Sequence, residues 1–132
     1  YQSYQPIFWR NAPDAREKQG PFLARTLRGE SSVALVHEHA GRVDGFLIGN
    51  LVPSPPAFRP AVVTCHVDDF CVAKPEEWSS VGKGLLHIAK RVAKERDVTQ
   101  VAVICGHLDQ LKRTMLASAG LTISSEWWVK AF

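Results

Sequence analysis

This sequence lacks the features that mark secreted or membrane-embedded proteins. Its three cysteines, Cys65, Cys71 and Cys105, have no Cys-x-x-Cys spacing, so we expect no disulfide framework and a reducing, cytoplasmic location. No apolar run approaches the roughly 18 residues that a membrane span needs. The first residues show no basic segment followed by an apolar run, so no signal peptide is predicted. We therefore expect no membrane partner.

The sequence also has no large excess of positive or negative charge. The net charge of +3 suits an anionic small ligand but is too small to argue for nucleic acid, so we expect no nucleic-acid partner. His37 and His39 fall on one face of an expected strand, but no third ligand is evident and His-Glu-x-x-His is absent. We therefore expect no metal site.

What is present is ordinary globular material. The chain has 132 residues, of which 45% are apolar and 22% charged. This length predicts a single domain over residues 1–132, large enough to bury a core without disulfides. Residues 1–20 show no clear periodicity at their start, and we expect an irregular arm or truncated first elements there.

The pattern of apolar residues predicts a mixed sheet with helices, an α/β (α+β) fold. Two helical pieces separated by Gly20-Pro21 precede a β-hairpin, a central strand and a strand–helix–strand crossover. The expected elements are helical pieces at 14–20 and 21–29, the hairpin at 32–52, strands at 61–72 and 98–106, a helix within 78–97 that ends at Asp97, and a helix at 108–120. Residues 121–132 are expected to add a last strand or short hairpin. Leu108, Leu111, Met115 and Ala119 should face inward from the second long helix.

The segment WSSVGKGLLHIAKRVAKERD, residues 78–97, begins a basic amphipathic helix with an open first turn. Gly82 and Gly84 carry no side chains to cover the free helical N–H groups, Lys83 adds a charge, and Ser79 and Ser80 offer hydroxyls. Such a turn could bind a phosphate or pyrophosphate. Alternatively, the glycines only form a flexible helix entry. Neither the P-loop nor the Rossmann glycine pattern is present.

The order of elements and one motif resemble the GNAT superfamily of acetyl-CoA-dependent N-acetyltransferases, over about residues 20–132. That family has a strand ending in Val, followed by [QR]-x-x-G-x-[GA] opening a helix; here Val72 is followed by SSVGKG at 79–84, with Ser in place of Gln or Arg. The resemblance implies an antiparallel meander joined to a strand–helix–strand crossover, in a central mixed sheet flanked by helices. It also implies acetyl-CoA as co-substrate. Backbone groups would bind its pyrophosphate at Ser79, Ser80, Val81, Gly82, Lys83 and Gly84, and its pantetheine arm at Phe70, Cys71 and Val72.

The strand segment HVDDFCV supplies candidates for acid–base chemistry. Asp69 or Asp68 could accept a proton from the attacking amine or anchor an ammonium substrate, and His66 is an alternative base. Equally, the aspartates could cap the strand or pair with Arg or Lys, and His66 could be structural. On an ideal strand His66 and Asp68 share one face and Asp69 the other, unless a bulge changes the alternation.

The usual thiolate-protonating Tyr of the family falls at Leu116 in this chain. Two functions therefore remain open: an N-acetyltransferase in which a small-molecule or peptide amine attacks acetyl-CoA directly, and a non-catalytic acyl-CoA-binding module for sensing or interaction. An unrelated nucleotide-phosphate binder is a third. The cysteines are expected to be buried and inert. Trp127 and Trp128 could line an acceptor pocket or pack in a homodimer.

Overall fold

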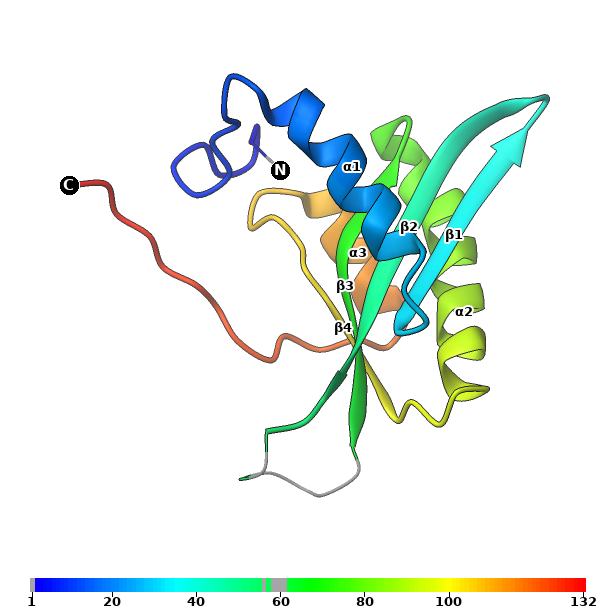
Figure 1. The fold of residues 1–132 in the computed structure, drawn as a ribbon. Helices are drawn as coiled ribbons and strands as arrows, with labels where there is room; N and C mark the ends of the chain where they lie inside the picture. The colour runs from blue at the N-terminus through cyan, green and yellow to red at the C-terminus, as the bar shows by residue number, and fades with distance from the viewer. Residues whose placement is uncertain (1, 56, 58–61) are drawn as a thin grey trace.

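The computed structural model describes residues 2–55, 57 and 62–132, and these form a four-stranded sheet with helices on both faces (Figure 1). The strands lie in the order β1-β2-β3-β4. Their bounds are β1 Ser32–His39, β2 Arg42–Pro53, β3 Val63–Val72 and β4 Gln100–Val103. The helices are α1 Ala15–Leu27, the 3-10 helix η1 Pro75–Ser79, α2 Val81–Lys94 and α3 Gln110–Ser118.

The sheet has the mixed topology expected from the sequence. β1 and β2 pair antiparallel, as do β2 and β3, whereas β3 and β4 are parallel and joined through α2. The hairpin turns at Ala40 and Gly41, whose φ angles of 50° and 74° are both positive, as a two-residue turn with the right twist requires. The predicted hairpin and the crossover are thus confirmed. Residue 61 of the predicted central strand lies outside the described residues.

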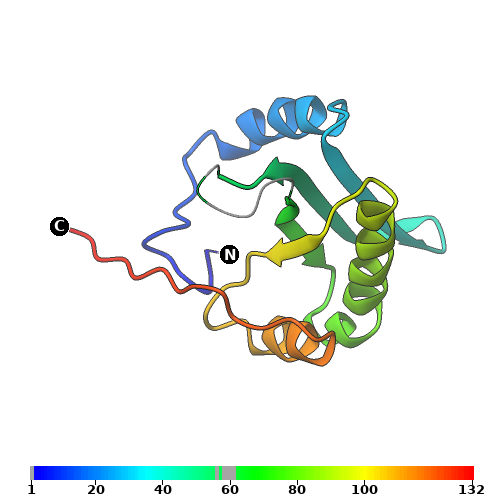
Figure 2. The same cartoon turned by 90° about the horizontal axis from the view of Figure 1, so that it is seen from below.

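The helices form two layers around the sheet. α1 lies over one face, and α2 and α3 lie over the other (Figures 1 and 2). α1 has no buried residue, so the core lies between the sheet and α2 with α3. Its buried members include Leu47 and Val67 from the sheet, Leu86 and Ala89 from α2, and Leu116 from α3. Burial of this apolar surface is the main source of stability for the fold.

Two predicted features of the helices differ from the structure. The two helical pieces are one continuous α1 with Pro21 inside it, because one missing N–H bond weakens an exposed helix without ending it. In α3, Leu108 and Leu111 are exposed, and the buried set is Lys112, Met115 and Leu116. The helix starts only at Gln110, so its inward face is set by spacings of three and four from Lys112.

The chain after α3 forms no strand. Residues 121–132 are expected to add a strand, but after Leu121, which packs against the core, they form an extended tail without regular secondary structure (Figure 2). β4 is likewise only four residues long. No helix among the described residues is long and apolar enough to cross a membrane.

Candidate functional site

The sheet opens where β3 leaves β4. The two strands pair only from Thr64 to Val67, and the last bond between them runs from Ile104 N to Val67 O at 3.0 Å. β3 then continues to Val72 paired with β2 alone. Within the described residues, no strand pairs with the other edge of β3 over 68–72. This edge, with its backbone N–H and C=O groups, is the centre of the candidate site.

A β-bulge lies at the start of this opening. The register with β2 shifts between Ile48, which faces Asp69, and Gly49, which faces Val67, so Asp68 is the extra residue. Buried positions accordingly change from Cys65 and Val67 to Phe70 and Val72. The alternation expected for an ideal strand is therefore wrong for Asp69, which lies on the face opposite Phe70, and the bulge is the cause.

The three predicted acid–base residues lie together at this bulge. His66 Nδ1 is 3.1 Å from Asp68 Oδ1, with both side chains 42% exposed. The pKa of Asp69 is raised, chiefly by burial and also by the charge of Asp68, while Lys112 opposes the shift. A carboxylate whose pKa is raised accepts a proton more readily at neutral pH. The role of Asp69 as a base stays a prediction, which its burial supports.

Sequence reasoning missed a buried lysine at the same opening. The side chain of Lys112 is fully buried, and its Nζ donates a hydrogen bond to the Phe70 carbonyl oxygen at 3.2 Å. Nζ also lies 5.1 Å from the Phe70 ring centre and 5.0 Å from that of Trp78. Burial lowers the pKa of Lys112 to about 8, although Cys105, Asp109, Cys71 and Asp69 all act to raise it. The spacing of Lys112 to Met115 and Leu116 was the sequence signal that could have revealed it.

Asp109 and Tyr4 are two further titratable residues close to the opening. Asp109 is buried and caps α3 by accepting a hydrogen bond from Lys112 N at 3.2 Å. Tyr4 packs against Gly106, where an added Cβ would lie 2.9 Å from the Tyr4 Cβ. The pKa of Tyr4 is raised, first by burial and then by Asp109, Cys71 and Cys105. The chain thus brings a tyrosine to the opening from its N-terminal arm, although α3 carries none.

The cysteines differ in environment. Cys65 is buried, Cys105 is half-buried, and Cys71 is exposed on the open segment of β3. Burial raises the pKa of the Cys65 and Cys105 thiols, which makes them poor nucleophiles at neutral pH. The expectation that all three are buried is wrong for Cys71, because the bulge turns its side chain away from the core.

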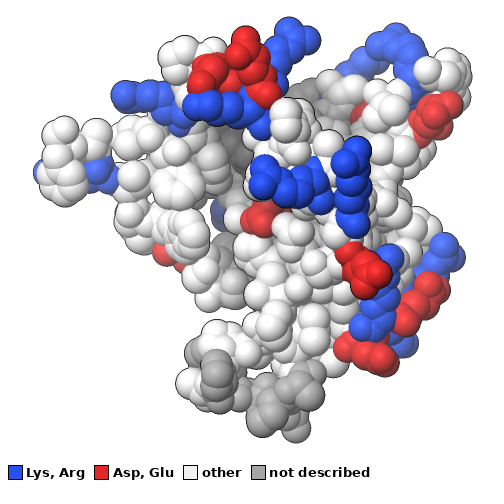
Figure 3. Space-filling model, viewed as in Figure 1, with Lys and Arg blue, Asp and Glu red and all other residues white. Residues whose placement is uncertain are grey.

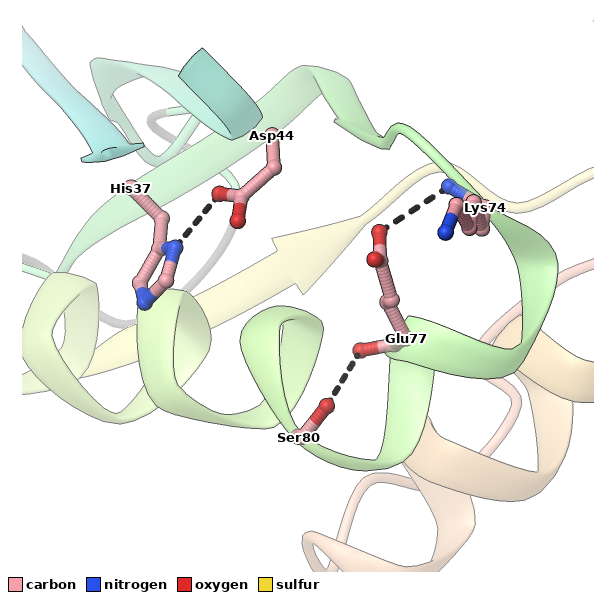
Figure 4. A network of polar contacts seen from close by, with 5 residues as sticks. All are labelled: His37, Asp44, Lys74, Glu77 and Ser80. Atoms are coloured by element: carbon pink, nitrogen blue, oxygen red, sulfur yellow. Dashed lines mark hydrogen bonds and ion pairs between the residues drawn. The ribbon is translucent and has the colours of Figure 1, made fainter. Parts of the chain in front are cut away.

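The start of α2 has no side-chain cap. The Ser79 and Ser80 hydroxyls donate instead to the Glu76 and Glu77 carbonyls, both at 3.3 Å. Figure 4 shows Glu77 at the centre of this turn; its carboxylate also accepts a hydrogen bond from Lys74 N at 3.0 Å. Within the predicted turn, the Ser80 N–H donates to Glu77 O at 3.2 Å and the Gly84 N–H donates to Ser80 O at 2.9 Å. The N–H groups of Val81, Gly82 and Lys83 have no side-chain cap and are the ones that an anion could bind.

The two glycines of this turn have different roles. A Cβ at Gly82 would lie 2.5 Å from the Trp78 ring, so this glycine is required for packing. A Cβ at Gly84 would meet nothing within 4 Å. Beside the turn, a cavity of about 170 Å³ lies between η1 and α3, with Ser79, Lys83 and Leu111 in its lining. Only part of the predicted loop therefore faces an open space.

The remaining polar residues do not suggest a metal site. His37 Nδ1 lies 2.5 Å from Asp44 Oδ1, so this histidine has a carboxylate partner (Figure 4). Among the described residues, no group of three or more His, Cys, Asp or Glu side chains could hold a metal ion. Lys and Arg alternate with Asp and Glu on the face seen in Figure 3, so that face carries no large patch of one sign.

Comparison with solved structures shows what this fold resembles. A variant of a Bacillus halodurans protein has a TM-score of 0.80 at 16% identity, covering 99% of this chain and 84% of that one. A predicted acetyltransferase with acetyl-CoA from Clostridium acetobutylicum has a TM-score of 0.73 at 15% identity, covering 92% and 77%. Ribosomal-protein-alanine N-acetyltransferase from Brucella melitensis biovar Abortus 2308 has a TM-score of 0.66 at 18% identity, covering 89% and 84%.

No family model matches the chain, and no curated protein has a matching sequence. The likeness therefore rests on structure alone. The sheet order, the parallel crossover and the helices on both faces give this chain the fold of known acetyltransferases, as the resemblance to the GNAT superfamily predicted.

Proposed function

We propose that this chain is an N-acetyltransferase that moves an acetyl group from acetyl-CoA to a primary amine. The observation that carries the proposal is the unpaired β3 edge, which ends beside the uncapped first turn of α2. An extended amide-containing arm can add to such an edge as a strand would, and a pyrophosphate can bind the free N–H groups of the turn. Solved acetyltransferases with this fold support the choice of donor.

The residues present fit this co-substrate at both ends of its path. The backbone of Phe70, Cys71 and Val72 offers the open edge, and the N–H groups of the α2 turn lie one short 3-10 helix further on. The Phe70 carbonyl already accepts a hydrogen bond from Lys112. It can accept a second from the arm, because a carbonyl oxygen has two lone pairs.

In the proposed reaction, the amine nitrogen attacks the acetyl carbonyl carbon directly. Asp69 takes the proton that the amine loses. The paired side chains of His66 and Asp68 add polar groups next to Asp69. A backbone N–H of the open β3 edge stabilises the negative oxygen of the tetrahedral intermediate. The carbon–sulfur bond then breaks and the thiolate leaves. The site therefore accelerates the reaction mainly by holding the amine and the thioester in the orientation that the attack requires.

Acetyl-CoA binding tests the proposal. At a concentration about a hundredfold above Kd, the ligand should add roughly 2.7 kcal/mol to the free energy of unfolding. Thermal unfolding with acetyl-CoA, CoA and ATP measures this effect, and only the two CoA compounds should stabilise the protein. Stabilisation by ATP alone would instead indicate a nucleotide-phosphate binder and overturn the proposal.

Leu116 favours a second candidate, a non-catalytic acyl-CoA-binding module, because the helix position of the usual acid is apolar. Release of CoA thiol over a panel of small amines and peptides separates the two functions. Turnover on any acceptor supports the enzyme, and tight binding without turnover supports the module. We further propose a reducing, cytoplasmic location, since all three cysteines are free and Cys71 is exposed.

A further inference from the structure

We propose that Lys112 is the proton donor for the leaving CoA thiolate, in place of the tyrosine that α3 lacks. This inference rests on the proposed function, and it assigns a role to a residue that neither the motif nor the fold predicts. Its starting point is position: Lys112 lies one helical turn before Leu116, on the same buried face of α3.

The geometry places the ammonium at the reacting edge. Lys112 Nζ donates to Phe70 O, a backbone acceptor in the middle of the unpaired segment of β3. Any acyl chain that binds along this edge must therefore pass beside Nζ. The rings of Phe70 and Trp78 fix the ammonium from its apolar side and exclude water from it.

The surrounding charges suit a group that cycles its proton. The groups that face Lys112 are Asp69 and Cys71 from β3, Cys105 after β4, and Asp109 at the start of α3. The carboxylates and thiols favour the charged ammonium, whereas burial opposes it, and the resulting pKa of about 8 is close to that of an ordinary thiol. Proton transfer between groups of similar pKa needs little driving force.

Tyr4 is the competing donor, and its environment argues against it. Burial and the charges of Asp109, Cys71 and Cys105 raise the pKa of Tyr4 above its ordinary value, so it holds its proton more tightly. Lys112 is shifted the other way and releases its proton more easily. Of the two, only Lys112 forms a hydrogen bond to the open edge that the structure shows.

The proton balance closes over one cycle. The amine forms the new carbon–nitrogen bond, the carbon–sulfur bond breaks, and sulfur takes its electron pair. The Lys112 ammonium gives one proton to the thiolate and becomes neutral. The proton that the amine lost to Asp69 then returns to Lys112, and Asp69 is again a carboxylate.

The test compares Lys112→Met with Lys90→Met, which removes an exposed lysine of α2 that lies outside its first turn. We expect Lys112→Met to lower kcat about a hundredfold or more while CoA binding, measured by calorimetry, is at least as tight as in the wild type. Wild-type kcat should fall above about pH 8, and this falling limb should be absent in Lys112→Met. Lys90→Met should match the wild type throughout.

Two further measurements separate the loss of a proton donor from other effects of Lys112→Met. S-acetyl-4-nitrothiophenol releases a thiolate that leaves without protonation, so wild type and Lys112→Met should use it at equal rates. Tyr4→Phe should retain the falling limb. The proposal is overturned if Lys112→Met keeps wild-type kcat with acetyl-CoA, or if Tyr4→Phe and not Lys112→Met removes the limb. Loss of CoA binding in the wild type would instead overturn the proposed function itself.

Discussion

At the scale of single residues, the most unusual feature is a lysine with no exposed surface. An ammonium group loses most of its hydration when it is buried, and its contacts, which include the hydrogen bond to Phe70 O and two aromatic rings, offset only part of that loss. The lowered pKa of Lys112 measures this cost. Natural sequences keep such residues at functional sites more often than elsewhere.

Lys112 also predicts how stability depends on pH. Its pKa is about 8 in the folded chain against the ordinary lysine value of 10.5, so between these pH values the unfolded chain binds more protons. The contribution of Lys112 to the free energy of unfolding should therefore rise by about 3 kcal/mol in total between pH 8 and pH 10.5. Below pH 8 the buried ammonium destabilises the folded chain by this full amount.

Urea unfolding at pH 7.5, 9 and 10 measures this effect as the difference between wild type and Lys112→Met. The raised pKa values of Tyr4 and Cys65 work in the opposite direction, but Lys112 is not among their causes, so they are common to both proteins. The Lys112 charge lowers the pKa of Cys105, so its loss raises that pKa further and makes the advantage of Lys112→Met shrink in the same direction. The stability advantage of Lys112→Met should shrink steadily as pH rises. An advantage that stays constant would contradict the prediction.

At the scale of one element, α2 shows that two glycines of a single motif serve different purposes. Gly82 leaves room for the Trp78 ring, and Trp78 in turn contacts the Lys112 ammonium. Gly84 leaves the helix surface open. One glycine of the motif therefore serves the packing of the core, and the other keeps the start of the helix exposed.

This difference predicts opposite effects of two matched substitutions. Gly82→Ala should destabilise the chain by about 1–3 kcal/mol, because the new methyl group would overlap the Trp78 ring. Gly84→Ala should stabilise it by roughly 0.5–1 kcal/mol, because alanine favours the helix and meets no neighbour. Urea denaturation measures both values, and equal effects of the two changes would refute this assignment.

At the scale of the whole molecule, the tail after α3 carries much of the exposed apolar surface. Trp127 is 77% exposed and Trp128 91%. Trp127 contacts Phe8 of the N-terminal arm, with ring centres 5.7 Å apart. The predicted acceptor pocket and dimer contact for these tryptophans both remain predictions.

Such a tail should promote association of the chain. Burying a tryptophan removes roughly 150–250 Å² from water, which favours contact between copies. We expect the sedimentation coefficient of the wild type to increase over micromolar concentrations and that of Trp127→Ser/Trp128→Ser to stay constant. A constant monomer value for both proteins would show that the tail drives no association.

The sequence by itself determined the order of the main elements from β1 to α3, the hairpin, the parallel crossover and the position of the glycine turn. These features depend on local periodicity and turn chemistry, which neighbouring residues carry. It also identified His66, Asp68 and Asp69 as a group, because they are adjacent in one strand.

Only the tertiary structure decided which side chains meet at the opening. The bulge at Asp68 moved Asp69 and Cys71 to the face opposite Phe70, and the start of α3 at Gln110 turned Lys112 inward. Lys112 and Phe70 are 42 residues apart in the chain, and no local pattern records their contact. The tail after α3 was predicted as a strand because its composition is strand-like, yet composition supplies no hydrogen-bonding partner.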